Sequence, residues 1–326
     1  MASENNNFLT VSLRGAGQVF FMENALTGLL FLVAIAYASY DAGQWATTIG
    51  AIIGLLVATV TAMWMGNDKP SIQSGLFGFN GILVGVALPT FIAVSPLLWF
   101  YIIVGAAVST VATATFAATL TKSWGVPGST GPFVLTAWLM VGGAYAFGAL
   151  DVTGDSARMA TDYISGAAVI PAADELVQIF FRNIAQVFLL GSAVSGVIIL
   201  IGIFIASRRA GLAAAAGSLV AMICAIGMRV DPTVVIQGLY GFSPVLTAMA
   251  VGVIFLDTSA KVVVYALLAT VATVFVQAAY DVVMSPLGLP SFTAPYVLTM
   301  YLFVAPKKAL APHPHAPVAE HQLDDA

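Results

Sequence analysis

Charged residues are scarce in this sequence. Asp, Glu, Lys and Arg together make up 8% of the 326 residues, whereas a soluble globular domain carries about a quarter. Hydrophobic residues account for 60%. This balance excludes an ordinary soluble enzyme and predicts an all-α polytopic membrane protein.

Cysteine and buried titratable groups are also nearly absent. The single cysteine, Cys224, rules out an intrachain disulfide and leaves the redox compartment open. The three histidines, His313, His315 and His321, all lie in the C-terminal tail, and the only acid placed well inside an apolar run is Glu23. Proton- or sodium-coupled carriers usually need intramembrane carboxylates or ionisable clusters, so a passive path for a neutral solute is favoured. The runs hold no nucleophile–base pair or metal cluster, and we therefore expect no enzyme, cofactor or metal site.

Ten apolar runs are present, each bounded by polar residues, glycine or proline. At roughly 20 residues per membrane crossing, they predict ten transmembrane helices. The runs lie at about Val19–Tyr40, Trp45–Met65, Gly81–Val94, Leu97–Leu120, Phe133–Phe147, Val187–Ala206, Leu212–Met228, Val245–Leu256, Val262–Met284 and Tyr296–Ala305. Small residues within the runs predict close helix packing; they include Gly28, Ala34, Gly50 and Gly54.

A polar connector separates the runs into two groups of five. We expect an N-terminal tail (1–13), a first five-helix repeat (14–147), an extracytoplasmic connector (148–181), a second, inverted five-helix repeat (182–306) and a disordered C-terminal tail (307–326). The order of the runs therefore predicts two halves of similar build.

Three motifs recur in the same order in both halves. Arg-x-x-x-Gln-Val-Phe begins at Arg14 and, 168 residues later, at Arg182. Gly-Leu-aromatic-Gly-Phe begins at Gly75 and, 163 residues later, at Gly238. Pro-x-x-Thr-x-Pro-aromatic spans Pro127–Phe133 and, again 163 residues later, Pro290–Tyr296. The shared order and spacing indicate a duplicated half.

Each half holds an odd number of runs, so the second half must enter the membrane from the opposite side. With a cytoplasmic N-terminus, eight Lys and Arg residues fall inside and only Arg158, Arg182 and Arg229 fall outside, as the positive-inside rule requires. This predicts a multi-pass protein of the cell (inner) membrane with both termini cytoplasmic. Two short polar segments, Pro70–Phe77 and Pro232–Tyr240, are expected to be re-entrant helices that start at proline.

The prolines of the doubled motif free backbone oxygens where lipid would forbid them. The side-chain polar groups near the expected repeat interface are Gln18, Gln186, Thr130 and Thr293, and the apolar residues around them are Val19, Phe20, Phe21, Phe79, Leu83, Phe242 and Leu246. Acceptor oxygens between flat apolar walls suit a small planar solute with several N–H donors, because they offset its dehydration. Taken singly, the glutamines could instead cap helix ends.

On these doubled motifs, the sequence resembles the urea transporter family from about Arg14 to Pro306. The resemblance implies two inverted five-helix halves with one re-entrant helix each, and a homotrimer in membrane lipid with one pore per subunit. It implies passive, channel-like transport of urea through a narrow pore between the two repeats, with no cofactor and no nucleic-acid partner. Two alternatives stay open: a channel of the same architecture for other small amides, ammonia or water, and an ion-coupled secondary transporter.

The family's substrate-binding positions are carried over where its motifs match this sequence. They are Gln18, Val19, Phe21, Phe79, Leu83 and Thr130 in the first half, and Gln186, Phe242, Leu246 and Thr293 in the second. The sequence departs from the family pattern at four places. Glu23-Asn24 replaces an asparagine pair, Leu189 stands where the first half has Phe21, Gly128 loosens the first proline motif, and Gln186 replaces an acid found in some bacterial members.

Overall fold

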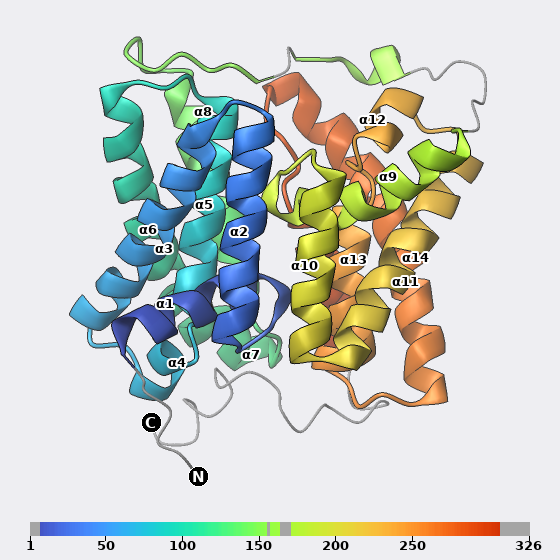
Figure 1. The fold of residues 1–326 in the computed structure, drawn as a ribbon, viewed down its shortest axis with the longest axis horizontal. Helices are drawn as coiled ribbons and strands as arrows, with labels where there is room; N and C mark the ends of the chain where they lie inside the picture. The colour runs from blue at the N-terminus through green and yellow to red at the C-terminus, as the bar shows by residue number, and fades with distance from the viewer. Residues whose placement is uncertain (1–6, 155–156, 164–170, 307–326) are drawn as a thin grey trace. The chain divides into compact units, whose positions relative to one another are not determined.

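The computed structural model describes residues 7–154, 157–163 and 171–306. Within these residues the chain is helical, and its only extended pairing is an isolated bridge between Ile92 and Val152. The all-α fold class is therefore confirmed. The described residues form two compact units that divide between Thr153 and Gly154 (Figure 1). The C-terminal tail after residue 306, with its three histidines, lies outside the described residues.

Unit 1 packs its helices through glycine contacts between α3 and α5. A Cβ added to Gly50 would meet the Gly85 carbonyl oxygen, and one added to Gly54 would meet that of Gly81. Such close approach of two backbones is typical of helices that pack in a membrane. The helices are α1 (Phe8–Gly17), η1 (Gln18–Phe20), α2 (Ala25–Asp41), α3 (Trp45–Trp64), α4 (Lys69–Gln73), α5 (Gly78–Phe91), α6 (Pro96–Phe116), the π-helical η2 (Ala117–Thr121), α7 (Lys122–Trp124) and α8 (Gly131–Ala144).

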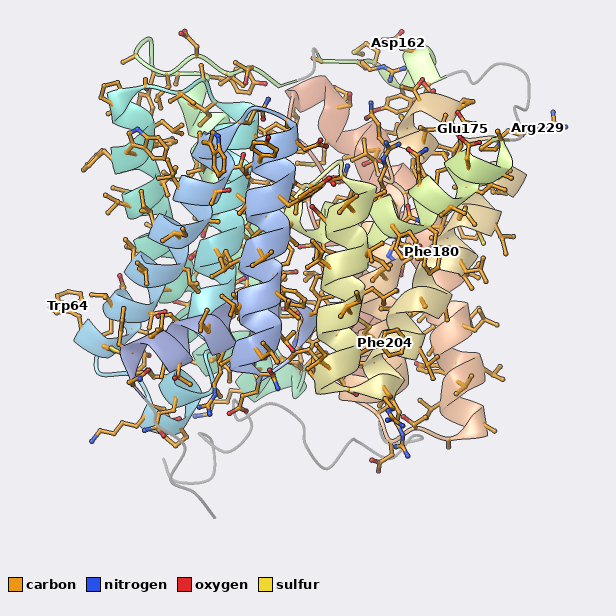
Figure 2. The ribbon with its side chains drawn as sticks, in the orientation of Figure 1. Trp64, Asp162, Glu175, Phe180, Phe204 and Arg229 are labelled. Atoms are coloured by element: carbon orange, nitrogen blue, oxygen red, sulfur yellow. The ribbon has the colours of Figure 1, made fainter. Side chains whose placement is uncertain are left out.

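Unit 2 repeats this order of helices. It contains η3 (Ala160–Tyr163), α9 (Ala173–Ala185), η4 (Gln186–Phe188), α10 (Ala193–Ala206), α11 (Arg208–Gly227), α12 (Pro232–Ile236), α13 (Phe242–Met249), the π-helical η5 (Ala250–Ile254), α14 (Ala260–Met284), η6 (Ser285–Leu287) and α15 (Ala294–Val304). Helix α9 thus starts inside the stretch expected as a connector. Figure 2 places Asp162, Glu175 and Arg229 toward one end of this unit and Phe204 toward the other.

Each unit begins with a sharply bent pair of helices. The axes of α1 and α2 differ by 74°, as do those of α9 and α10, and Figure 1 shows α1 running across α2. The chain turns at Phe21 (φ 63°) and Leu189 (φ 55°), both in the left-handed region. The next helix is then capped by Asn24, whose side chain accepts from the Thr27 N–H, or by Ser192. The bends were not expected from the sequence.

Two acids lie elsewhere than the sequence indicated. Glu23 is exposed in the non-helical break between η1 and α2, so it does not lie a turn into a continuous helix, and its place in a membrane span stays a prediction. Asp281 lies in the last turn of α14, within a helix long and apolar enough to cross a membrane. The sequence reading passed over it because the surrounding run is otherwise apolar.

The two short helices begin as expected but end early. Asp68 caps α4 by accepting from the Ser71 N–H, and Asp231 caps α12 by accepting from the Thr233 N–H. Each helix has only five residues and is followed by a turn with a positive-φ glycine, Gly75 or Gly238. The predicted re-entrant segments therefore each consist of one helical turn and a loop.

Within residues 7–154, 157–163 and 171–306, four helices are long and apolar enough to cross a membrane alone, and counting each bent pair as one span raises this number to six. Four more apolar helices, Gly78–Phe91, Gly131–Ala144, Phe242–Ile254 and Ala294–Val304, have fewer than 18 residues. At 1.5 Å per residue they reach at most about 21 Å, against roughly 30 Å of hydrocarbon. Length and composition thus supply up to six crossings among the described helices. The four shorter helices do not span the hydrocarbon by length, and the count of ten transmembrane helices stays a prediction.

The π-helical turns explain why the two halves do not align at one constant spacing. Phe79 and Phe242 differ by 163 in number, whereas the N-cap serines of α6 and α14, Ser95 and Ser259, differ by 164. Between these positions unit 2 contains η5, and a π turn accommodates one extra residue. Unit 1 contains η2 after α6, which returns the spacing to 163.

Equivalent hydrogen bonds support this register. The Tyr101 hydroxyl donates to the Met140 carbonyl at 2.8 Å, and the Tyr265 hydroxyl donates to the Phe303 carbonyl at 2.9 Å. The tyrosines differ by 164 and the acceptors by 163, as expected for residues on either side of η2. Residues of α6 before η2 therefore correspond to residues of α14 at a spacing of 164.

Candidate functional site

In unit 1 an arginine and a glutamine hold the end of α4. Arg14 Nη1 donates to the Gln73 carbonyl oxygen at 3.0 Å, and Gln18 Nε2 donates to the Ser74 carbonyl oxygen at 2.9 Å. These carbonyls belong to a helix end, where backbone oxygens have no intrahelical donor. Arg14 and Gln18 are four residues apart and so lie on one face of the helical turn. We call this pair with its two carbonyls the unit 1 clamp.

Unit 2 contains the same arrangement, the unit 2 clamp. Arg182 Nη1 donates to the Ile236 carbonyl at 3.0 Å, and Gln186 Nε2 donates to the Gln237 carbonyl at 2.8 Å. The glutamines therefore do cap a helix end, but only through their amide nitrogens. Both side chains are more accessible than the core around them, and among the described residues neither Oε1 receives a hydrogen bond. Each glutamine thus presents an oriented acceptor.

The residues that follow Gln18 differ in exposure. Val19 and Phe20 are fully buried, and the Phe20 ring packs on Phe31 with a centroid distance of 5.3 Å. Phe21 is partly exposed because the left-handed turn directs the chain away from η1. In unit 2 the counterpart of Phe21 is Leu189, which has the same backbone conformation. Of Val19, Phe20 and Phe21, only Phe21 is therefore partly exposed.

Helix α5 carries Phe79 and Leu83, and both are buried. Asn80, between them, is fully buried and joins three segments. Its Nδ2 donates to Thr113 Oγ1 at 3.0 Å and to the Ser129 carbonyl at 3.3 Å, and its Oδ1 accepts from the Phe133 N–H at 3.2 Å. Thr130, the N-cap of α8, lies between these last two contacts in the chain. The structure therefore brings Thr130 next to α5.

In unit 2 the corresponding turn is held from a different helix. Thr293 is the N-cap of α15 and is 2% exposed. The preceding residues are fastened by Gln277 of α14, whose Nε2 donates to Ser291 Oγ at 2.8 Å and to Asp281 Oδ1 at 2.8 Å. Phe242 and Leu246 on α13 are buried. Sequence reasoning missed Asn80, Gln277 and Asp281, whose side chains hold the turns before α8 and α15.

The ten candidate residues thus fall into two sets. The unit 1 set is Gln18, Val19, Phe21, Phe79, Leu83 and Thr130, and the unit 2 set is Gln186, Phe242, Leu246 and Thr293. Each set combines an oriented glutamine oxygen, a threonine at a helix N-terminus and buried aliphatic or aromatic walls. Among the described residues no group of three or more His, Cys, Asp or Glu side chains is arranged to hold a metal ion.

Comparison with known proteins identifies the family. A family model described as "Urea transporter" matches residues 9–308. Similar curated proteins include Urea transporter 1 of Capra hircus, 27% identical over 308 residues that cover 91% of this chain and 76% of the relative. Urea transporter 1 of Rattus norvegicus is 26% identical and that of Mus musculus 27% identical, with the same coverage of both chains. Because the family match extends over nearly the whole chain, this protein belongs to the urea transporter family.

Proposed function

We propose that the chain carries urea passively across a membrane and that the unit 1 and unit 2 sets contact the solute. The observation that supports these sets is the repeated clamp: each unit fixes a glutamine by its nitrogen and leaves its oxygen as an acceptor. Urea is planar and has four N–H donors, so it can exchange hydrogen bonds with water for hydrogen bonds with such oxygens. Apolar walls beside them exclude hydrated ions, whose dehydration costs far more.

The ionisable groups in the apolar helices support passive transport over ion coupling. Arg14 and Arg182 are occupied with the carbonyls of α4 and α12. Asp281 is hydrogen-bonded by Gln277 and Ser291. A proton- or sodium-coupled carrier needs a carboxylate that can exchange its cation during each cycle. A carboxylate that anchors neighbouring side chains is poorly suited to that task.

Urea flux in proteoliposomes tests the function. We expect flux above that of protein-free vesicles, weak saturation with urea concentration, and inhibition by thiourea-like analogues. Imposing or collapsing a proton or sodium gradient should leave the urea rate unchanged, because no step binds an ion. Water and ammonia permeability measured in the same vesicles separates a urea channel from a less selective one. Urea uptake that stops when the gradient is removed would contradict passive transport.

We further propose a homotrimer in the lipid of the inner membrane, with the connector on the extracytoplasmic side and both termini in the cytoplasm. The distribution of Lys and Arg supports these sides. In a Cys224→Ser background, the Asp162→Cys variant should react with an impermeant thiol reagent added outside intact cells. The Arg209→Cys variant should react only after lysis. Reaction of both from outside would contradict the proposed sides, and a mass other than three chains in detergent-free discs would contradict the trimer.

A further inference from the structure

The proline-bracketed turn of unit 1 is held by an amide on α5. Asn80 contacts the turn on both sides of Thr130, at the Ser129 carbonyl and the Phe133 N–H. Its third partner is Thr113 of α6, a short side chain that in turn donates to the Ser109 carbonyl at 2.8 Å. The long amide thus comes from α5 and the short hydroxyl from α6.

In unit 2 the two equivalent positions carry the opposite side-chain types, with the short hydroxyl where unit 1 has the amide and the amide where unit 1 has the hydroxyl. Asn80 corresponds to Ser243 at the spacing of 163, and Thr113 corresponds to Gln277 at the spacing of 164 that holds before η2. The short hydroxyl is now on α13 and the long amide on α14. Ser243 is fully buried, and its hydroxyl has no hydrogen-bond partner in the described residues. Gln277 is 1% exposed and takes over the contact with the turn.

A carboxylate fixes Gln277 in this role. Asp281, one helical turn further along α14, accepts from Gln277 Nε2, and the Ser291 hydroxyl is hydrogen-bonded to the same carboxylate. The Tyr163 hydroxyl donates to the Asp281 backbone carbonyl at 3.0 Å, which ties η3 to this part of α14. The side chains of Gln277, Asp281 and Ser291 therefore form one hydrogen-bonded network that ends two residues before Thr293, and within the described residues Gln277 Oε1 has no hydrogen-bond partner.

We propose that Gln277, supported by Asp281, is a positioning residue: it holds the turn before α15 so that Thr293 can contact urea, as Asn80 holds the turn that contains Thr130. This inference rests on the proposed function, because it assigns Thr293 to the urea path. It follows that the two threonines are held by unlike networks. A change at Gln277 acts on Thr293 and leaves Thr130 in place.

A double-mutant cycle of urea flux per folded protein tests this inference. Gln277→Leu removes both hydrogen bonds and is expected to lower flux about tenfold. In a Thr293→Val background the same substitution should lower flux by less than about threefold, since the hydroxyl it positions is gone. In a Thr130→Val background the full tenfold loss should return. Equal losses in both backgrounds would mean that Gln277 acts only on general stability and would overturn the inference.

Two further variants sharpen the outcome. Gln277→Glu places two carboxylates together and should lower flux, whereas Gln277→Glu with Asp281→Asn restores complementary partners and should recover at least half of it. A double variant as inactive as the single one would overturn the pairing. Ser243→Ala deletes a hydroxyl without a partner and should keep wild-type flux. Wild-type flux in Thr293→Val would remove Thr293 from the path and the inference with it, while absence of urea flux in the wild-type protein would reject the proposed function itself.

Discussion

Replacing Gly28 or Gly196 with alanine is expected to prevent native folding and to abolish urea flux. A Cβ at Gly28 would overlap the Leu13 carbonyl oxygen, and a Cβ at Gly196 would overlap that of Phe181. Both obstacles are backbone atoms at the crossing of a bent helix pair, so neither can rotate away. Separating the helices enough to admit a methyl group costs about 3 kcal/mol, the upper end of the usual range for overpacking, because the overlap is with backbone atoms. The yield of monodisperse protein in size-exclusion chromatography measures the effect.

The matched control for Gly196→Ala is a glycine in the nearby break between α9 and α10. Gly191 has nothing within 4 Å of an added Cβ and no positive φ, so Gly191→Ala should give wild-type yield and flux. Gly227→Ala, at the end of α11, is a second open position. If Gly28→Ala and Gly196→Ala were as stable as these controls, the helices of each bent pair would not be packed as closely as described.

The helical class and the duplication could be predicted because both depend on local patterns. Gly28 and Gly196 differ by 168, the same spacing as Arg14 and Arg182, and the structure gives both glycines the same obstacle. Close packing at Gly28 could therefore be expected from composition alone. Its partner, the Leu13 carbonyl, could not, because it lies on a helix that the hydropathy pattern places outside the first run.

The bends could not be predicted because they occur at residues that seldom adopt a left-handed backbone. Phe21 and Leu189 have positive φ although neither is glycine, and bulky side chains are rare in this region. A prediction from residue type alone therefore continues the helix through Phe21 and Leu189. The cap residues Asn24 and Ser192 were the available signal, since each marks a new helix start just after the bend.

The candidate residues could be chosen from their motifs, but their hydrogen-bond partners could not be predicted. Gln18 and Gln186 were identified from their motif, yet each binds a carbonyl more than 50 residues away, which no local pattern reports. Gln277 was missed for a further reason. At the constant spacing of 163 it aligns with Ala114, and only the π turns η5 and η2 together show that it corresponds to Thr113.

Replacing Arg14 with methionine is expected to lower both thermal stability and urea flux by a large amount. Arg14 is 6% exposed, and its loss leaves the Gln73 carbonyl without its donor, at a cost of about 1–3 kcal/mol. The helix α4 has five residues and cannot stay helical by itself. Without its clamp, the turn that leads into α5 and Phe79 loses its anchor. Lys69→Met removes an exposed charge from the same short helix and should leave both quantities unchanged.

Gln18→Leu separates the two roles of the clamp, because this side chain has a nitrogen that binds α4 and an oxygen that we assign to urea. If the nitrogen alone mattered, Gln18→Leu would lower melting temperature and flux in the same proportion as Arg14→Met. We expect a smaller loss of stability and a flux reduced about tenfold or more, since the acceptor is removed together with the donor. Melting temperature and urea flux measured on the same preparations decide between these outcomes. A Gln18→Leu protein with normal flux would take this oxygen out of the path.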